Sequence, residues 1–201
     1  VDFEIPDRIK DGYGINESII EQAHADGVEV ILTCDNGISA FHQVELAKKY
    51  GMTVVITDHH EVPLDGEKEK IPPADAVIDP KQADCPYPFP EICGAVVAYK
   101  LVQVLYARRG VSQMEWLDLL EFAAIATVGD VMKLQDENRI LVREGLKRLH
   151  RTANLGMRAL ILQNQLTPEQ ITSYHIGFVL GPCVNASGRL ETAKIALNLF
   201  L

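Results

Sequence analysis

The stretch that decides the fold is MTVVITDHH, residues 52–60. Its first six residues, 52–57, are mostly apolar and β-branched, which is typical of a strand buried on both faces of a parallel sheet. Asp58, His59 and His60 follow this strand without a gap. Because ligands of open parallel sheets bind at the carboxyl ends of the strands, the stretch predicts a buried strand with a functional site at its end.

The same arrangement occurs once earlier in the chain. VEVILTC at 28–34 is another buried-strand pattern, and Asp35 follows it directly. Neighbouring strands lie about 5 Å apart, so Asp35 and His59 could bind one ion if these strands are neighbours. Gly37 would let the backbone turn tightly after Asp35. Alternatively Asp35 could cap the next helix and residues 58–60 could form a polar loop, but two such sites at consecutive strand ends favour a metal site.

Helices and a further strand pattern surround these two strands. Helical spacing of apolar residues predicts helices at 15–25 and 41–51, and ADAVID at 74–79 is a third strand pattern. Helices that alternate with buried strands indicate an α/β fold with a parallel sheet flanked by helices. We expect residues 1–80 to form this partial α/β core, which contains the acid-x-Gly turn and the DHH stretch.

The chain becomes helical beyond a Pro-rich loop at 81–92. Helical spacing recurs at 93–110, 115–130, 137–151 and 154–165. Thr167 followed by Pro168 predicts the start of another helix. We expect the mostly helical C-terminal half, residues 81–201, to be the helical part of the same domain and the start of a connector towards a further C-terminal domain.

Composition limits the class of protein. The 201 residues are 47% hydrophobic and 23% charged, as in soluble globular proteins. The net charge of −9 gives no general attraction to nucleic acid. The four cysteines include no CxxC pair, which favours reduced thiols and a cytoplasmic location, and no apolar run is long enough to cross a membrane. Val1 and the apolar last residues suggest a piece of a longer protein.

Asp130 is a third candidate ligand. Its segment, residues 122–132, is apolar except for Thr127 and Asp130. A buried carboxylate is costly unless it is paired or binds a metal; the alternative is an acid at a helix end that reaches solvent. Carboxylate and imidazole donors together suit Mn²⁺, Zn²⁺ or Fe²⁺ better than Ca²⁺.

In their order along the chain, these motifs resemble those of the DHH phosphoesterase family, in particular its branch of single-strand-specific DNA exonucleases. The resemblance is carried by IPDRIKDGYG at 5–14, the acid-x-Gly turn at 35–37, DHH at 58–60, CGAVVAYKL at 93–101, ATVGD at 126–130 and GPCVNASGRLETA at 181–193. It implies two divalent ions, Mn²⁺ or Mg²⁺, with Asp35 bridging them and His59 and Asp130 binding one of them. His60 would lie near the substrate phosphate, and Asp58 would orient the histidines.

The resemblance also implies contacts with single-stranded DNA. Arg8 and Arg189 would bind phosphates through their planar guanidinium groups, helped by Asn185 and the backbone at Gly188. The alternatives are a surface side chain for Arg8 and a structural salt bridge for Arg189.

A separate basic pattern lies within 137–151. Arg139, Arg143, Lys147 and Arg151 recur every four residues, which places them on one helix face. This face is either a path for single-stranded DNA or simply solvated.

The activity that the resemblance implies is 5′ to 3′ hydrolysis of single-stranded DNA in repair and recombination, with other repair proteins as further partners and no membrane. One rival is a phosphodiesterase for short oligonucleotides or cyclic dinucleotides; another is a non-catalytic scaffold that binds DNA or replication proteins. The family's upstream DxDxDG motif, which supplies further metal ligands, does not occur in this sequence. We therefore expect these 201 residues alone to bind metal weakly and to have little nuclease activity.

Overall fold

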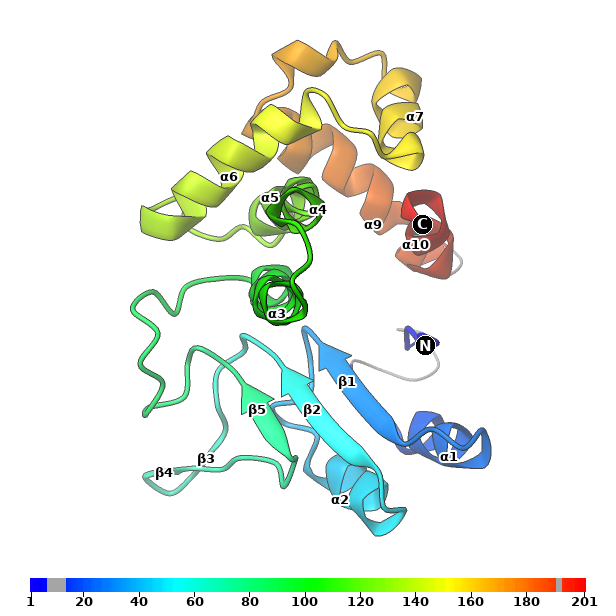
Figure 1. Ribbon diagram of the computed structural model, residues 1–201, viewed down its shortest axis with the longest axis vertical. Coiled ribbons are helices and arrows are strands. Elements are labelled where there is room, and N and C mark those ends of the chain that lie inside the picture. The colour runs from blue at the N-terminus through cyan, green and yellow to red at the C-terminus, as the bar shows by residue number, and fades with distance from the viewer. Residues whose placement is uncertain (7–13, 191–192) are drawn as a thin grey trace. The chain divides into compact units, whose positions relative to one another are not determined.

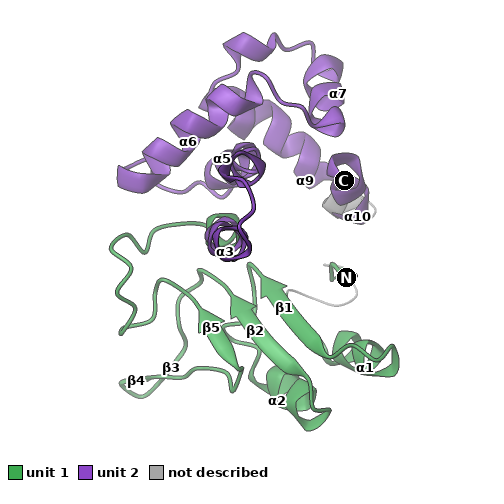
Figure 2. Ribbon diagram, in the orientation of Figure 1, with its two compact units in different colours: residues 1–98 green, residues 99–201 purple. Residues whose placement is uncertain are grey.

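The computed structural model describes residues 1–6, 14–190 and 193–201. The chain forms two compact units, Val1–Ala98 and Tyr99–Leu201 (Figure 2). The boundary at residue 80 that the sequence predicted lies just after the last strand of the sheet, which ends at Ile78. The domain organisation itself stays a prediction.

The first unit is built on a three-stranded parallel sheet in the order β1-β2-β5 (Figure 1). Its strands are β1 Val30–Cys34, β2 Thr53–Thr57 and β5 Ala76–Ile78. Cys34 pairs with Thr57, and Thr57 pairs with Ile78. All three strands therefore end at the same level, and the predicted α/β fold with a parallel sheet is confirmed.

Two helices pack against this sheet. They are α1 Glu17–Ala25, capped by the Asn16 side chain on the Ile19 N–H, and α2 Phe41–Lys49. The shared core consists of buried residues from both helices and from the region of β2: Ile20, Val44, Ala47, Met52, Val54 and Ile56. Burial of these apolar side chains is the main force that holds the sheet and its two helices together.

The edge strand departs from the prediction. β1 was expected to be buried on both faces, yet Val30 and Leu32 are 58% and 50% exposed. β1 lies at the edge of the described sheet, and one of its faces is uncovered there. A short hairpin, β3 Leu64–Asp65 and β4 Lys68–Glu69, was not predicted, although Asp65 and Gly66 are typical hairpin-turn residues.

The second unit is helical. The helix α3, Gly94–Arg109, begins in the first unit and continues into the second. The remaining elements are α4 Gln113–Leu117, α5 Leu120–Gly129, α6 Asp136–Leu149, α7 Leu155–Gln163, η1 Pro168–Gln170, α8 Ser173–His175, the π-helix η2 Ile176–Leu180, α9 Gly181–Leu190 and α10 Ala193–Phe200. Its core gathers Leu149, Met157, Ile161, Ile171, Ile176 and Leu180.

Two helix predictions were wrong in detail. The helix predicted at 115–130 is divided into α4 and α5, because the chain turns at Asp118 and Leu119. The helix expected to start at Thr167 is only the three-residue 3₁₀ turn η1, in which Thr167 makes no side-chain cap within the described structure. In the described part of the chain, no helix has both the length and the apolar character that a membrane span requires.

Candidate metal site

The turn after β1 positions Asp35. Its backbone N–H donates to the Thr57 carbonyl at 3.0 Å, which extends the ladder by one residue, and its φ is +63°. Gly37 follows with φ +117°, and a Cβ there would lie 2.8 Å from Thr33 Oγ1. Only glycine fits this turn without strain. The N-cap position of α2 is Ala40, so Asp35 does not cap that helix.

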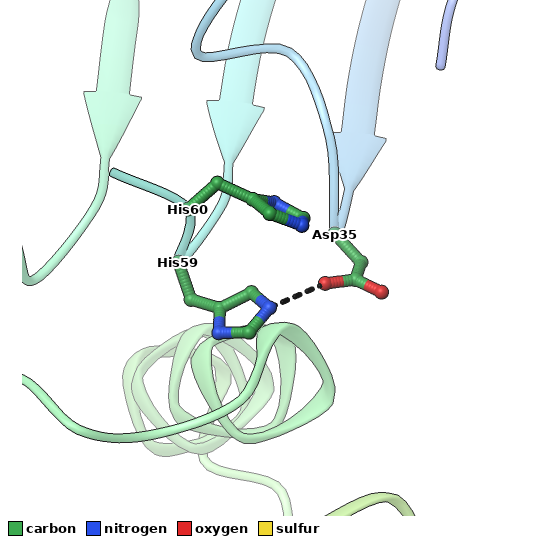
Figure 3. A group of neighbouring side chains, drawn as sticks. All are labelled: Asp35, His59 and His60. Atoms are coloured by element: carbon green, nitrogen blue, oxygen red, sulfur yellow. Dashed lines mark ion pairs between the residues drawn. The ribbon is translucent and has the colours of Figure 1, made fainter. Parts of the chain in front are cut away.

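Asp35, His59 and His60 converge at the ends of β1 and β2 (Figure 3). His59 Nε2 lies 3.0 Å from Asp35 Oδ1. One ligand atom from each of the three residues lies within 4.8 Å of the others. His59 is largely buried, whereas the Asp35 side chain is 61% exposed. The site therefore has a fixed inner edge and an outer carboxylate open to solvent.

Asp58 organises the segment that carries the two histidines. Its buried carboxylate accepts hydrogen bonds from the backbone N–H groups of Ile38, His59 and His60, at 2.9, 2.8 and 3.3 Å. Its Oδ1 also lies 2.6 Å from His60 Nδ1. Burial alone would raise the pKa of Asp58, but these hydrogen bonds and the charge of His60 outweigh it and lower the pKa. An ionised acceptor therefore fixes both the turn and the His60 ring.

The sequence patterns did not single out Asp79, which follows β5 directly. The Asp58 N–H donates to the Ile78 carbonyl at 3.0 Å, so the ladder between β2 and β5 continues to the level of Asp79. Asp79 is 1% exposed. Burial raises the pKa of Asp79, and the nearby carboxylate of Asp58 adds to the increase. The hydrogen bond from the Lys81 N–H and the electrostatic effects of His59 and Lys81 act in the opposite direction but do not outweigh burial. The available signal was simple: an aspartate stands at the end of each of the three predicted strands or directly after it.

Gly94 brings the start of α3 close to Asp35. A Cβ built on Gly94 would collide with the carboxylate and Cβ of Asp35. The glycine in CGAVV therefore permits a close approach between a helix backbone and a candidate metal ligand.

The predicted third ligand lies in the second unit. Asp130 occupies the C-cap position of α5 and is exposed, not buried as its apolar neighbours had indicated. An acid at a helix end reaches solvent easily, and this is the alternative that the sequence had left open. The part of Asp130 in the metal site stays a prediction.

The predicted DNA-binding residues are placed as follows. Arg8 lies outside the described residues. Asn185 is exposed on α9, and α9 also includes Gly188 and Arg189. On α6, Arg143 and Lys147 are exposed, and both pair with Glu144 at 2.9 Å. Their contacts with DNA stay predictions.

The donors of the strand-end group suit a divalent ion. One carboxylate and two imidazoles are the ligand types that Mn²⁺, Fe²⁺ and Zn²⁺ accept in proteins. The Asp58–His60 hydrogen bond leaves His60 Nε2 facing the group, and a carboxylate behind an imidazole is the usual support for a metal-binding histidine.

Curated relatives of this chain are exonucleases by name. It is 40% identical over 201 residues to the single-stranded-DNA-specific exonuclease RecJ of Bacillus subtilis, which covers 100% of this chain and 24% of the relative. It is 35% identical over 211 residues to RecJ of Escherichia coli, covering 100% of this chain and 36% of the relative. The chain thus spans about a quarter to a third of the length of these relatives.

Solved structures show the same fold. A crystal structure of exonuclease RecJ bound to manganese matches with a TM-score of 0.83 at 31% identity, over 98% of this chain and 48% of that one. RecJ from Thermus thermophilus in complex with Mn²⁺ matches with a TM-score of 0.76 at 30% identity, over 94% of this chain and 27% of that one. Residues 1–127 match the family description "DHH family, N-terminal domain", and the chain therefore belongs to the DHH family.

Proposed function

We propose that this chain supplies metal-binding residues of a single-strand-specific DNA exonuclease that degrades DNA from 5′ to 3′ with two divalent ions, Mn²⁺ or Mg²⁺, in repair and recombination. The names of the relatives and the manganese in the matching RecJ structures support the substrate and the ion. The observation that carries the proposal is the group of ligand atoms from Asp35, His59 and His60 at the ends of two neighbouring strands.

Each residue of the group has a distinct task in this proposal. Asp35, exposed and joined to His59 Nε2 by a 3.0 Å contact, would bridge the two ions. His59 would bind one ion from the buried side, together with Asp130. His60, held by Asp58, would face the substrate phosphate. The ions, when bound, would activate water and offset the charge on the attacking and leaving oxygens.

DNA binding would come from the residues outside this group. Arg8 and Arg189 would hold phosphates, with Asn185 and the backbone at Gly188, and Arg143 and Lys147 on α6 would line the strand's path. Guanidinium groups bind phosphate through two parallel hydrogen bonds. The four cysteines form no disulfide, which accords with the proposed cytoplasmic location, and other repair proteins would be further partners.

Two measurements test this function. In the first, Mn²⁺ binding to the 201-residue chain is followed by electron paramagnetic resonance, and binding should be lost in Asp35→Ala and His59→Ala. In the second, the natural protein that contains this sequence is given single-stranded DNA labelled at its 5′ or its 3′ end. Release of label first from the 5′ end, abolished by Asp35→Ala, is the expected result.

Other outcomes point to the rivals. Preferential cleavage of dinucleotides over long single strands would indicate a small-substrate phosphodiesterase. DNA binding that needs no divalent ion, without cleavage, would indicate a scaffold. Either result would contradict the proposed exonuclease.

A further inference from the structure

Asp79 is a buried carboxylate in which only one of the two oxygens accepts a hydrogen bond among the described residues. It is 1% exposed. One oxygen, Oδ1, accepts the Lys81 N–H at 2.9 Å. The other oxygen, Oδ2, is buried and has no hydrogen-bond partner among the described residues. Leaving a buried acceptor unsatisfied destabilises the folded chain, so an acid at this position calls for a functional reason.

The surroundings of Asp79 point to the metal site. β2 and β5 pair in parallel up to Thr57 and Ile78, and the next hydrogen bond joins Asp58 to the Ile78 carbonyl. Asp79 therefore lies one residue beyond the last paired position, beside the DHH segment. Asp58, His59 and Lys81 are the titratable neighbours that influence the pKa of Asp79. It is not part of the group of ligand atoms formed by Asp35, His59 and His60.

The same segment already shows how a carboxylate can support an imidazole. Asp58 Oδ1 lies 2.6 Å from His60 Nδ1, so the first acid of DHH supports the second histidine. Towards His59, the same carboxylate bonds only the backbone N–H among its described contacts. His59 turns Nε2 towards Asp35. Once an ion occupies Nε2, the ring proton must reside on Nδ1, where metal-binding histidines generally donate to a carboxylate or carbonyl.

We propose that Asp79 is a positioning residue that accepts a hydrogen bond from His59 Nδ1 and so holds Nε2 towards the bound ion. The two histidines would then each have their own aspartate, Asp58 for His60 and Asp79 for His59. The proposal rests on the metal site of the proposed function. It extends that site to the third strand: Asp79, which follows β5, would support His59, the ligand that follows β2.

The test compares variants of the 201-residue chain in Mn²⁺ binding. Asp79→Ala removes both acceptor oxygens and should weaken Mn²⁺ binding about 10-fold or more. Asp79→Asn retains one acceptor oxygen for the Lys81 N–H and the His59 Nδ1–H, so its loss of Mn²⁺ affinity should be smaller. This variant replaces the alanine variant in the test if the alanine variant does not fold. Asp75→Ala is the matched control: Asp75, like Asp79, accepts a backbone N–H, in its case that of Val54, but it also pairs with Lys48. This control should keep the wild-type Mn²⁺ affinity.

A spectroscopic measurement separates positioning from a purely structural role. With diamagnetic Zn²⁺ in place of Mn²⁺, ¹⁵N NMR should show the His59 proton on Nδ1 in the wild type and a change at that nitrogen in Asp79→Ala. Unchanged Mn²⁺ affinity and unchanged His59 ring signals in both Asp79 variants would overturn the inference while leaving the proposed function intact. A wild-type chain that binds no Mn²⁺ would overturn both.

Discussion

The two charged groups that stand out in this chain, the strand-end acids and histidines and the basic face of α6, are built in opposite ways. Asp58 is 1% exposed and accepts a hydrogen bond from Ile38, twenty residues away. On α6, the described partner of Arg143 and Lys147 is Glu144, which is close to both in sequence, and all three side chains are substantially exposed. The strand-end group depends on long-range structure, whereas the α6 face depends on local spacing alone.

This difference predicts how each group responds to change. A buried acceptor with several donors is expensive to remove, because each donor is left without a partner. Exposed ion pairs contribute little to stability, since solvent and salt screen them. Substitutions at the strand ends should therefore act strongly and at a distance, and those on α6 weakly and locally.

The largest expected effect is that of Asp58→Ala. The change leaves the backbone N–H groups of Ile38, His59 and His60 without their acceptor and should lower the free energy of unfolding by about 3 kcal/mol. Urea denaturation measures the loss. Asp58→Asn, which retains one acceptor oxygen, should lose less. If the alanine variant is as stable as the wild type, the buried hydrogen bonds of Asp58 do not hold the segment together.

Gly94→Ala should act on the site with little effect on the fold. The added Cβ collides with the Asp35 carboxylate, so Asp35 must move, and Mn²⁺ affinity should fall about 10-fold. Gly129→Ala is the matched control, because nothing lies within 4 Å of a Cβ at that helical glycine. Isothermal titration of Mn²⁺ into both variants decides the point; equal affinities would show that α3 does not constrain Asp35.

The pKa values of Asp58 and Glu144 sharpen the comparison. Burial raises the pKa of Asp58, but its hydrogen bonds outweigh burial and the pKa is lowered. The pKa of Glu144 is lowered by hydrogen bonds from Lys147 and Arg143 at the exposed surface. Salt on the order of 1 M should return the pKa of Glu144 towards its usual value and leave that of Asp58 low. NMR titration of the carboxyl carbons measures both; a similar salt response would remove the distinction.

The lowered pKa of Asp58 also makes the free energy of unfolding depend on pH. The unfolded chain binds the proton more tightly than the folded chain, so this contribution is complete above the ordinary value of 3.8 and is lost as the pH falls through the folded value. Asp58→Asn should flatten the dependence of unfolding free energy on pH in that acidic range.

The smallest expected effect is that of Glu144→Gln. Stability should hardly change, because the ion pairs of Glu144 are exposed. The change leaves Arg143 and Lys147 without their acidic partner, so binding of single-stranded DNA should strengthen and its salt dependence should steepen. Arg143→Glu should do the reverse. DNA affinity that is the same in both variants would indicate that this face is only solvated.

Parts of the structure followed directly from local pattern. The mostly apolar and β-branched run at 52–57 before Asp58 predicted β2, and a similar run before Asp35 predicted β1. The resemblance of the ordered motifs led to the DHH family, which residues 1–127 match. Such signals survive because a buried strand needs a continuous apolar run whatever surrounds it.

Other features depended on contacts between distant segments. The apolar pattern at 28–34 predicted a doubly buried strand, but Val30 and Leu32 are exposed, because a strand's covering comes from other segments. Helical spacing ran through 115–130 without a break, yet the chain turns at Asp118 and Leu119. The sequence pattern indicated only that Asp79 lies at the end of a strand. The pairing of β2 with β5 in the structure brings Asp79 beside the DHH segment.

The sequence by itself determined the parallel strands, the acids and histidines at their ends, and the family, because apolar runs and short motifs are local properties of the chain. Only the tertiary structure decided that Asp58 is the buried acceptor for Ile38 and His60, that Gly94 meets Asp35, and that Asp79 lies beside the DHH segment. The physical reason is that hydrogen bonds, burial and electrostatic shifts depend on which distant segments meet, and strand order and register set those meetings.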